Sequence, residues 1–115
     1  MVHGNKLRKF GRKRKVRNAL MESLAVALIT QKKIRTTEAK AKSLRPFIEK
    51  IVTTGKGKTL AAERKIIAAI GVTSARKIMN DIAPKYKERS GGYTRITKLP
   101  RRASDAAKMA VIEFV

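Results

Sequence analysis

Residues 32–55 read KKIRTTEAKAKSLRPFIEKIVTTG, and this stretch decides the fold because its periodicity changes partway along. Residues 32–37 alternate and are rich in β-branched side chains, which predicts a short strand. Thr37 can cap a helix that begins at Glu38, whose carboxylate suits the positive end of the helix dipole. The apolar residues that continue at helical spacing are Ala41, Leu44, Ile48, Ile51 and Val52. We therefore expect a strand that leads directly into an amphipathic helix.

Two further signals in this stretch concern the course of the helix. Pro46 lacks a backbone donor, so it should kink the helix or its first turn. The stretch TGKG at 54–57 is a stop signal in which glycine can supply the C-terminal cap.

A helix is also predicted on the N-terminal side, over residues 16–31. Its apolar residues fall four apart, and smaller or flexible ones widen the stripe. These residues are Val16, Leu20, Leu24 and Leu28, with Met21, Ala25 and Ala27 beside them.

Two shorter helices should follow the stop signal. The first spans residues 60–70 and is closed by Gly71. The second spans residues 74–82, with Ser74 as its cap and Pro84 as its terminator. We expect Ile78, Met79 and Ile82 to be buried, and Leu20, Leu24, Leu44, Ile48 and Ile51 to join Ile78 in the scaffold.

The C-terminal part returns to a period of two, over residues 93–99 and again over 107–115, with a break at 100–105. The order of elements is helix, strand, three helices and two strands. This order predicts an α+β fold of two layers, a small mixed sheet covered by helices on one face. Residues 16–115 should form a single compact domain, preceded by a basic arm at 1–15.

The charge of the chain is far from balanced. Its 115 residues include 29 Lys and Arg but 8 Asp and Glu, which gives a net charge of +21. The first 17 residues contain eight cations and no acid, yet the other 98 positions still carry +13. Like charges at this density repel one another, so a polyanion should be needed to complete folding or ordering. Nucleic acid is the obvious candidate.

Other functions have weaker support. The acids are scattered among cations, which keep carboxylates ionised and unsuited to acid–base catalysis, so we interpret them as solvated counter-charges. There is no cysteine, and His3 is the only histidine, so no metal site or cofactor is expected. The stretch GKGKT at 55–59 lacks the Walker spacing. With no apolar run long enough for a bilayer and no signal peptide, we expect a soluble, unexported protein without membrane or small-molecule partners.

Several stretches together resemble the bacterial-type large-ribosomal-subunit protein seventeen family. They are KLRKFGRKRKVRNAL, IRTTEAKAKSLRPFIEKIVT, SGGYTRI and MAVIEF, and the match runs nearly end to end. The resemblance implies a structural protein, not an enzyme, that binds rRNA on the solvent side of the large subunit near the polypeptide exit. It also implies a location in the cytoplasm, within the ribosome, and a place beside other large-subunit proteins, among them protein thirty-two.

The predicted RNA-binding residues fall into groups along the chain. Arginine can fork bidentately to phosphate, whereas lysine acts as a point charge. The arm and first helix contribute His3, Lys6, Arg8, Lys9, Arg12, Lys13, Arg14, Lys15 and Arg17. The strand and helix at 32–55 contribute Arg35, Thr36, Thr37, Lys40 and Lys42. The C-terminal part contributes Arg89, Gly91, Gly92, Tyr93, Arg95, Arg101 and Arg102.

Two hypotheses of other classes remain open from the sequence. The same charge suits a nucleoid-type or regulatory DNA-binding protein, since cations neutralise phosphates of either nucleic acid. An RNA-modifying enzyme is the third possibility.

In the C-terminal hairpin, alternation should place Ile96 inward and Tyr93, Arg95 and Thr97 on the opposite face.

Overall fold

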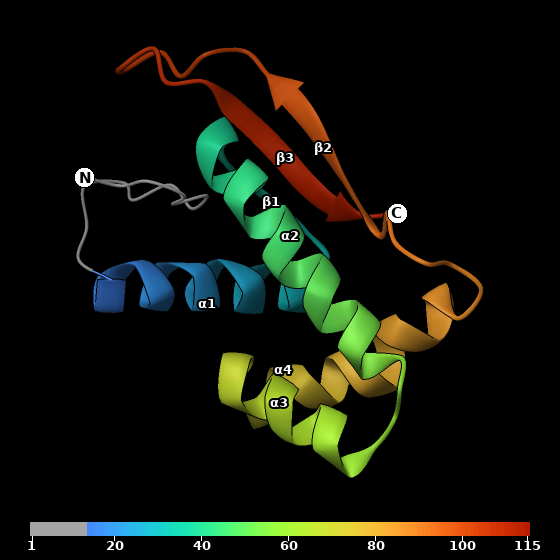
Figure 1. Ribbon diagram of the computed structural model, residues 1–115. Coiled ribbons are helices and arrows are strands. Elements are labelled where there is room, and N and C mark those ends of the chain that lie inside the picture. The colour runs from blue at the N-terminus through green and yellow to red at the C-terminus, as the bar shows by residue number, and fades with distance from the viewer. Residues whose placement is uncertain (1–13) are drawn as a thin grey trace, which may run out of the picture.

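The computed structural model describes residues 14–115 and has the predicted order of elements. Figure 1 shows the helices gathered on one side of a small sheet, which confirms the α+β fold. The elements are α1 (Arg14–Gln31), β1 (Lys33–Thr37), α2 (Glu38–Gly55), α3 (Leu60–Ile70), α4 (Val72–Lys77), the π-helical turn η1 (Ile78–Ile82), the 3-10 turn η2 (Ala83–Tyr86), β2 (Thr94–Leu99) and β3 (Met109–Phe114).

The three strands lie in the order β1-β3-β2, and both pairings are antiparallel. Our expectation of a mixed sheet is therefore wrong. The C-terminal strand β3 inserts between the other two and runs opposite to each of them. The strands β1 and β2 share a direction, but β3 separates them, so no parallel pair forms.

Helix α2 is the central element of the fold. It contacts all three strands, and it also contacts α1, α3 and η1 (Figure 1). Its start is the predicted one, because the backbone N–H of Lys40 donates to Thr37 Oγ1 at 3.3 Å. The helix continues through Pro46 as far as Gly55.

The end of α2 corrects the predicted glycine cap. The capping residue is Lys56, in the ordinary right-handed conformation. Gly55 is the last helical residue, and it is buried where η1 packs closely on α2. A Cβ added at Gly55 would lie 2.8 Å from Ile78 Cγ2, so glycine is required here for space.

The helices after α2 are partly as predicted. Helix α3 has the expected bounds, and Gly71 follows it with a φ of 88°, a conformation that favours glycine. Helix α4 begins directly after Gly71, so Ser74 lies buried inside the helix and does not cap it. Pro84, the predicted terminator, is the second residue of η2, where its fixed φ suits the first turn of a helix.

The core lies where α2 meets the sheet and the other helices. The predicted Leu44, Ile48, Ile51 and Ile78 are buried. Helix α1 begins at Arg14, two residues earlier than expected, and its first turns extend beyond the core. Val16 is therefore 46% exposed, and the buried residues of α1 are Ala25, Leu28 and Ile29.

The close approach at Gly55 generates a stability prediction. We expect Gly55→Ala to lower the free energy of unfolding by about 1–2 kcal/mol, because overpacking against Ile78 outweighs the better helix propensity of alanine. Urea denaturation measures the change. Gly57→Ala is the matched control, since its Cβ would meet nothing nearer than Thr54 O at 3.4 Å. A Gly55→Ala protein as stable as this control would contradict the packing argument.

Candidate nucleic-acid interface

The register of the sheet brings two predicted arginines onto one face. Arg35 lies opposite Val111, which lies opposite Thr97. Two residues further along β3, Glu113 is flanked by Lys33 and Arg95 on the same face. Lys33, Arg35 and Arg95 are exposed. We call this surface, made by Lys33, Arg35, Arg95, Thr97, Val111 and Glu113, the outer sheet face.

The other face of the sheet explains why these cations point outward. Ile34, Ile112 and Ile96 are aligned across the three strands and belong to the hydrophobic core or pack against it. Since alternate residues of a strand point to opposite sides, burying these isoleucines exposes the neighbouring cations. The predicted inward position of Ile96 and outward positions of Arg95 and Thr97 are confirmed.

Glu113 organises the outer sheet face. Its carboxylate accepts hydrogen bonds from Arg95 Nε at 3.1 Å and Arg95 Nη2 at 2.6 Å, and it lies 3.8 Å from Lys33 Nζ. The hydrogen bond from the Arg95 guanidinium holds the pKa of Glu113 below its usual range. One carboxylate among three cations leaves the face positive, so a phosphate backbone is its natural counterpart.

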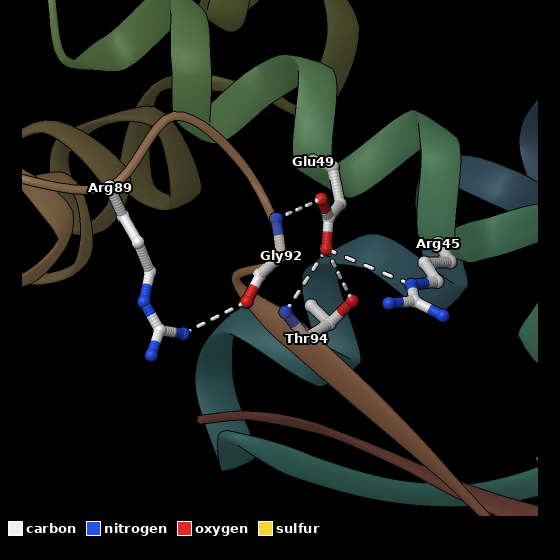
Figure 2. A network of polar contacts seen from close by, with 5 residues as sticks. All are labelled: Arg45, Glu49, Arg89, Gly92 and Thr94. Carbon is white, nitrogen blue, oxygen red and sulfur yellow. Dashed lines mark hydrogen bonds and ion pairs between the residues drawn. The ribbon is translucent and has the colours of Figure 1, made fainter.

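A second polar network fixes the loop that precedes β2, and its centre is Glu49 of α2. Glu49 Oε1 accepts from the Gly92 N–H at 2.9 Å. Glu49 Oε2 accepts from the Thr94 N–H at 3.0 Å and the Thr94 hydroxyl at 2.8 Å. Figure 2 shows these bonds together with Arg45, whose Nε lies 3.8 Å from Glu49, and with Arg89, which donates to Gly92 O at 3.0 Å.

Sequence reasoning missed the role of Glu49. The interpretation of the acids as solvated counter-charges is wrong here, because this carboxylate accepts three hydrogen bonds. Glu49 and Gly92 are 43 residues apart in the chain. No local pattern therefore signals the contact. The expected turn at Gly91 and Gly92 does exist, with φ values of 157° and 66°.

Tyr93 requires a second correction. The sequence predicts an RNA contact for it on the same side as Arg95, but its side chain is fully buried. The chain turns at Gly92, so Tyr93 points into the core, with its ring centroid 5.1 Å from that of Tyr86. Its hydroxyl oxygen lies 3.0 Å from Thr53 Oγ1 and accepts from Lys56 Nζ at 3.2 Å. Tyr93 thus joins the loop to α2 and is not available to a partner.

Arg101 and Arg102 lie in the turn between β2 and β3, at the opposite end of β2 from Gly92. Both are engaged within this turn. Arg101 donates to Ala106 O at 3.0 Å, and Arg102 donates from two nitrogens to the two oxygens of Asp105, each at 2.9 Å. Asp105 also accepts from the Ala107 N–H at 3.2 Å. The first role of Arg101 and Arg102 is therefore to shape the turn, although both side chains remain exposed.

The other predicted residues are dispersed. Arg14, Lys15 and Arg17 lie on the first turn of α1, where Arg17 Nε is buried without a hydrogen-bond partner among residues 14–115. In β1, Thr36 is buried and Thr37 caps α2. On α2, Lys40 is half-buried, and Lys42 forms an ion pair with Glu38 at 2.8 Å. The predicted residues that lie outside the described range are His3, Lys6, Arg8, Lys9, Arg12 and Lys13.

Neither a metal site nor a membrane span is found in the part of the chain that the structure describes. Within residues 14–115, no three His, Cys, Asp or Glu residues lie close enough together to hold a metal ion. In the same range, every helix is too short or too polar to cross a bilayer.

The Glu49 network generates a second prediction. We expect Glu49→Gln to lower the free energy of unfolding by about 1–3 kcal/mol, because the glutamine N–H₂ group would face a backbone donor and leave it unsatisfied. Amide hydrogen exchange should rise at Gly92 and Thr94. Glu88→Gln is the control, since Glu88 is exposed and makes no ion pair with residues 14–115. Equal exchange at Thr94 in both variants would contradict this role.

The β2–β3 turn generates a pH prediction. The two hydrogen bonds from Arg102, and then the one from the Ala107 N–H, lower the pKa of Asp105 from 3.8 to about 2. A lowered pKa means that the bonds stabilise the turn fully above pH 3.8 and are lost as the pH falls through about 2. In an NMR titration, the Ala107 amide should therefore shift with a midpoint near 2, while the amide of buried Ile48 reports that the fold is intact.

Asp105→Asn serves as the control for this titration, and its Ala107 amide should not titrate in the same range. A midpoint at the ordinary 3.8 in the parent protein would contradict the pairing.

Comparisons with known proteins identify the family of the chain. The family model for ribosomal protein L17 matches residues 20–115. The large ribosomal subunit protein bL17 of Persephonella marina is 51% identical, with 100% of this chain and 95% of that protein covered. The bL17 proteins of Fusobacterium nucleatum and Methylocella silvestris are 45% and 49% identical over all of this chain, with 100% and 82% of their lengths covered. The chain therefore belongs to the ribosomal protein L17 family.

Proposed function

We propose that this chain binds folded large-subunit rRNA near the polypeptide exit and stabilises it, through a basic arm at residues 1–15 and the basic surface of the domain at 16–115. Membership of the L17 family makes the chain a structural protein of the large ribosomal subunit, within the ribosome in the cytoplasm, and not an enzyme. The observation that carries the RNA-binding part is the outer sheet face, where exposed cations are arranged around Glu113.

The chemistry of this face suits a folded RNA backbone. Phosphate contacts fix position, and the shape of folded RNA supplies selectivity, because the deep groove of A-form RNA hinders base reading. Arg35 offers a forked guanidinium group from β1, and Arg95 offers the N–H groups that Glu113 does not accept.

Neighbouring large-subunit proteins are further partners in this proposal, with protein thirty-two among them. The alternative is a nucleoid-type or regulatory DNA-binding protein. The positive charge of the chain would suit that function too, but membership of the L17 family does not support it. Sedimentation of the tagged full chain in cell extract separates the two. We expect migration with large subunits after a moderate salt wash, whereas migration with DNA, or as free protein, would overturn the proposal.

The outer sheet face generates a substitution test. Arg35→Ala combined with Arg95→Ala should weaken binding to large-subunit rRNA. The slope of log affinity against log salt should become less steep by about 0.7–0.9 for each phosphate that the variant no longer neutralises. Arg64→Ala combined with Arg76→Ala removes the same charge from exposed positions on α3 and α4. If both double variants change the slope equally, net charge and not the outer sheet face governs binding.

A further inference from the structure

The helical side of the molecule carries a groove that the RNA-binding proposal does not use. Its larger part is a cavity of about 560 Å³, within the size range of pockets that enclose ligand groups. A second cavity of about 280 Å³ shares Phe47, Lys50 and Ala69 with it, so the two form one groove along α2. We call this the helix groove; α1 lines it with Met21 and Glu22, α2 with Phe47 and Lys50, and α3 with Lys65 and Ala69.

The helix groove and the Glu49 network lie on opposite sides of α2. Residues two positions apart on a helix are separated by about 200° around its axis. Phe47 therefore faces the groove while Glu49 faces the loop before β2. A partner in the groove would not compete with one that covers the loop or the sheet.

The charge of the groove argues against RNA as its occupant. Of the nine residues that line the larger cavity, Glu22 and Lys50 are the charged ones, and their charges cancel. In a chain with a net charge of +21, the larger cavity of the helix groove is thus neutral and largely apolar. A run of phosphates would gain little in this cavity, because phosphate binding depends on cations and Glu22 offsets Lys50 there. A half-buried Phe47 beside small alanines instead suits an apolar side chain of a polypeptide.

The rim of the groove indicates the charge of that polypeptide. Lys50 and Lys65 both border the smaller cavity, and neither makes an ion pair with any acid in residues 14–115. An acidic residue beside the apolar one would complement both ammonium groups. We propose that the helix groove docks a segment of a neighbouring protein of the large subunit, an apolar side chain flanked by an acid. This inference rests on the proposed function, which places such proteins around the chain.

Photo-cross-linking in purified large subunits tests the inference. A benzophenone amino acid replaces Ala68, an exposed residue that lines the larger cavity, in the tagged full chain. We expect an adduct that is destroyed by protease but resists RNase, and whose cross-linked peptide carries Asp or Glu close to the attachment point. The same photo-reactive residue at Thr97, on the outer sheet face, should give an adduct with rRNA.

A charge reversal supplies the decisive comparison. Lys50→Glu should reduce the yield of the Ala68 adduct by about tenfold or more, because like charges that face each other across an interface are strongly unfavourable. Lys85→Glu reverses the same charge at an exposed position on η2, away from the groove, and should leave the yield unchanged. Both positions are exposed, so neither variant should impair folding.

The remaining outcomes separate this inference from the proposed function. Absence of the chain from large subunits overturns both. If the chain is present in large subunits, three results at Ala68 overturn the docking inference alone. They are no adduct, an adduct with RNA, and an adduct between two copies of the chain. Equal yields from Lys50→Glu and Lys85→Glu also overturn it.

Discussion

The contact between the Glu49 carboxylate and the loop before β2 is the constraint on which the arrangement of the fold depends. Helix α2 packs on the sheet through apolar residues, and apolar packing alone does not fix the direction of a neighbouring loop. Glu49 supplies that direction, because its two oxygens receive the backbone donors of Gly92 and Thr94. The loop then directs Tyr93 into the core and starts β2 in the register that exposes Arg95.

Four of the eight acids of this cationic chain have a common use within its structure. Glu38 pairs with Lys42, Glu49 holds the loop, Asp105 closes the β2–β3 turn, and Glu113 lies between Lys33 and Arg95. Each carboxylate reduces repulsion at a point where the backbone must hold a definite shape. Most cations in residues 14–115 have no such partner, Arg35 among them, whereas Lys33 and Arg95 on the outer sheet face are held by Glu113. These four acids are thus better described as fasteners within the fold than as counter-charges spread over the surface.

Helix α2 also divides the molecule into two kinds of surface. The sheet side presents arginines and a lysine on its strands, and the opposite side of α2 presents a groove whose larger cavity is neutral. A protein that fills space between RNA and other proteins needs both kinds of surface. The antiparallel sheet and the helices supply both surfaces because each element buries one apolar side. The residues on its other side can then differ in charge and polarity from one element to the next.

The sequence by itself determined the elements and most of their bounds, because these depend on neighbours in the chain. The alternation at residues 33–37, the cap at Thr37 and the spacing of Leu44, Ile48 and Ile51 are local signals, and they predicted β1 and α2 correctly. The alternation at residues 93–99 likewise predicted the outward position of Arg95. What only the tertiary structure decided were contacts between distant residues: β3 inserted between β1 and β2, Gly55 against Ile78, and Glu49 on Gly92. Such contacts arise from the folded packing of separate segments, and no periodicity or composition within either segment encodes them.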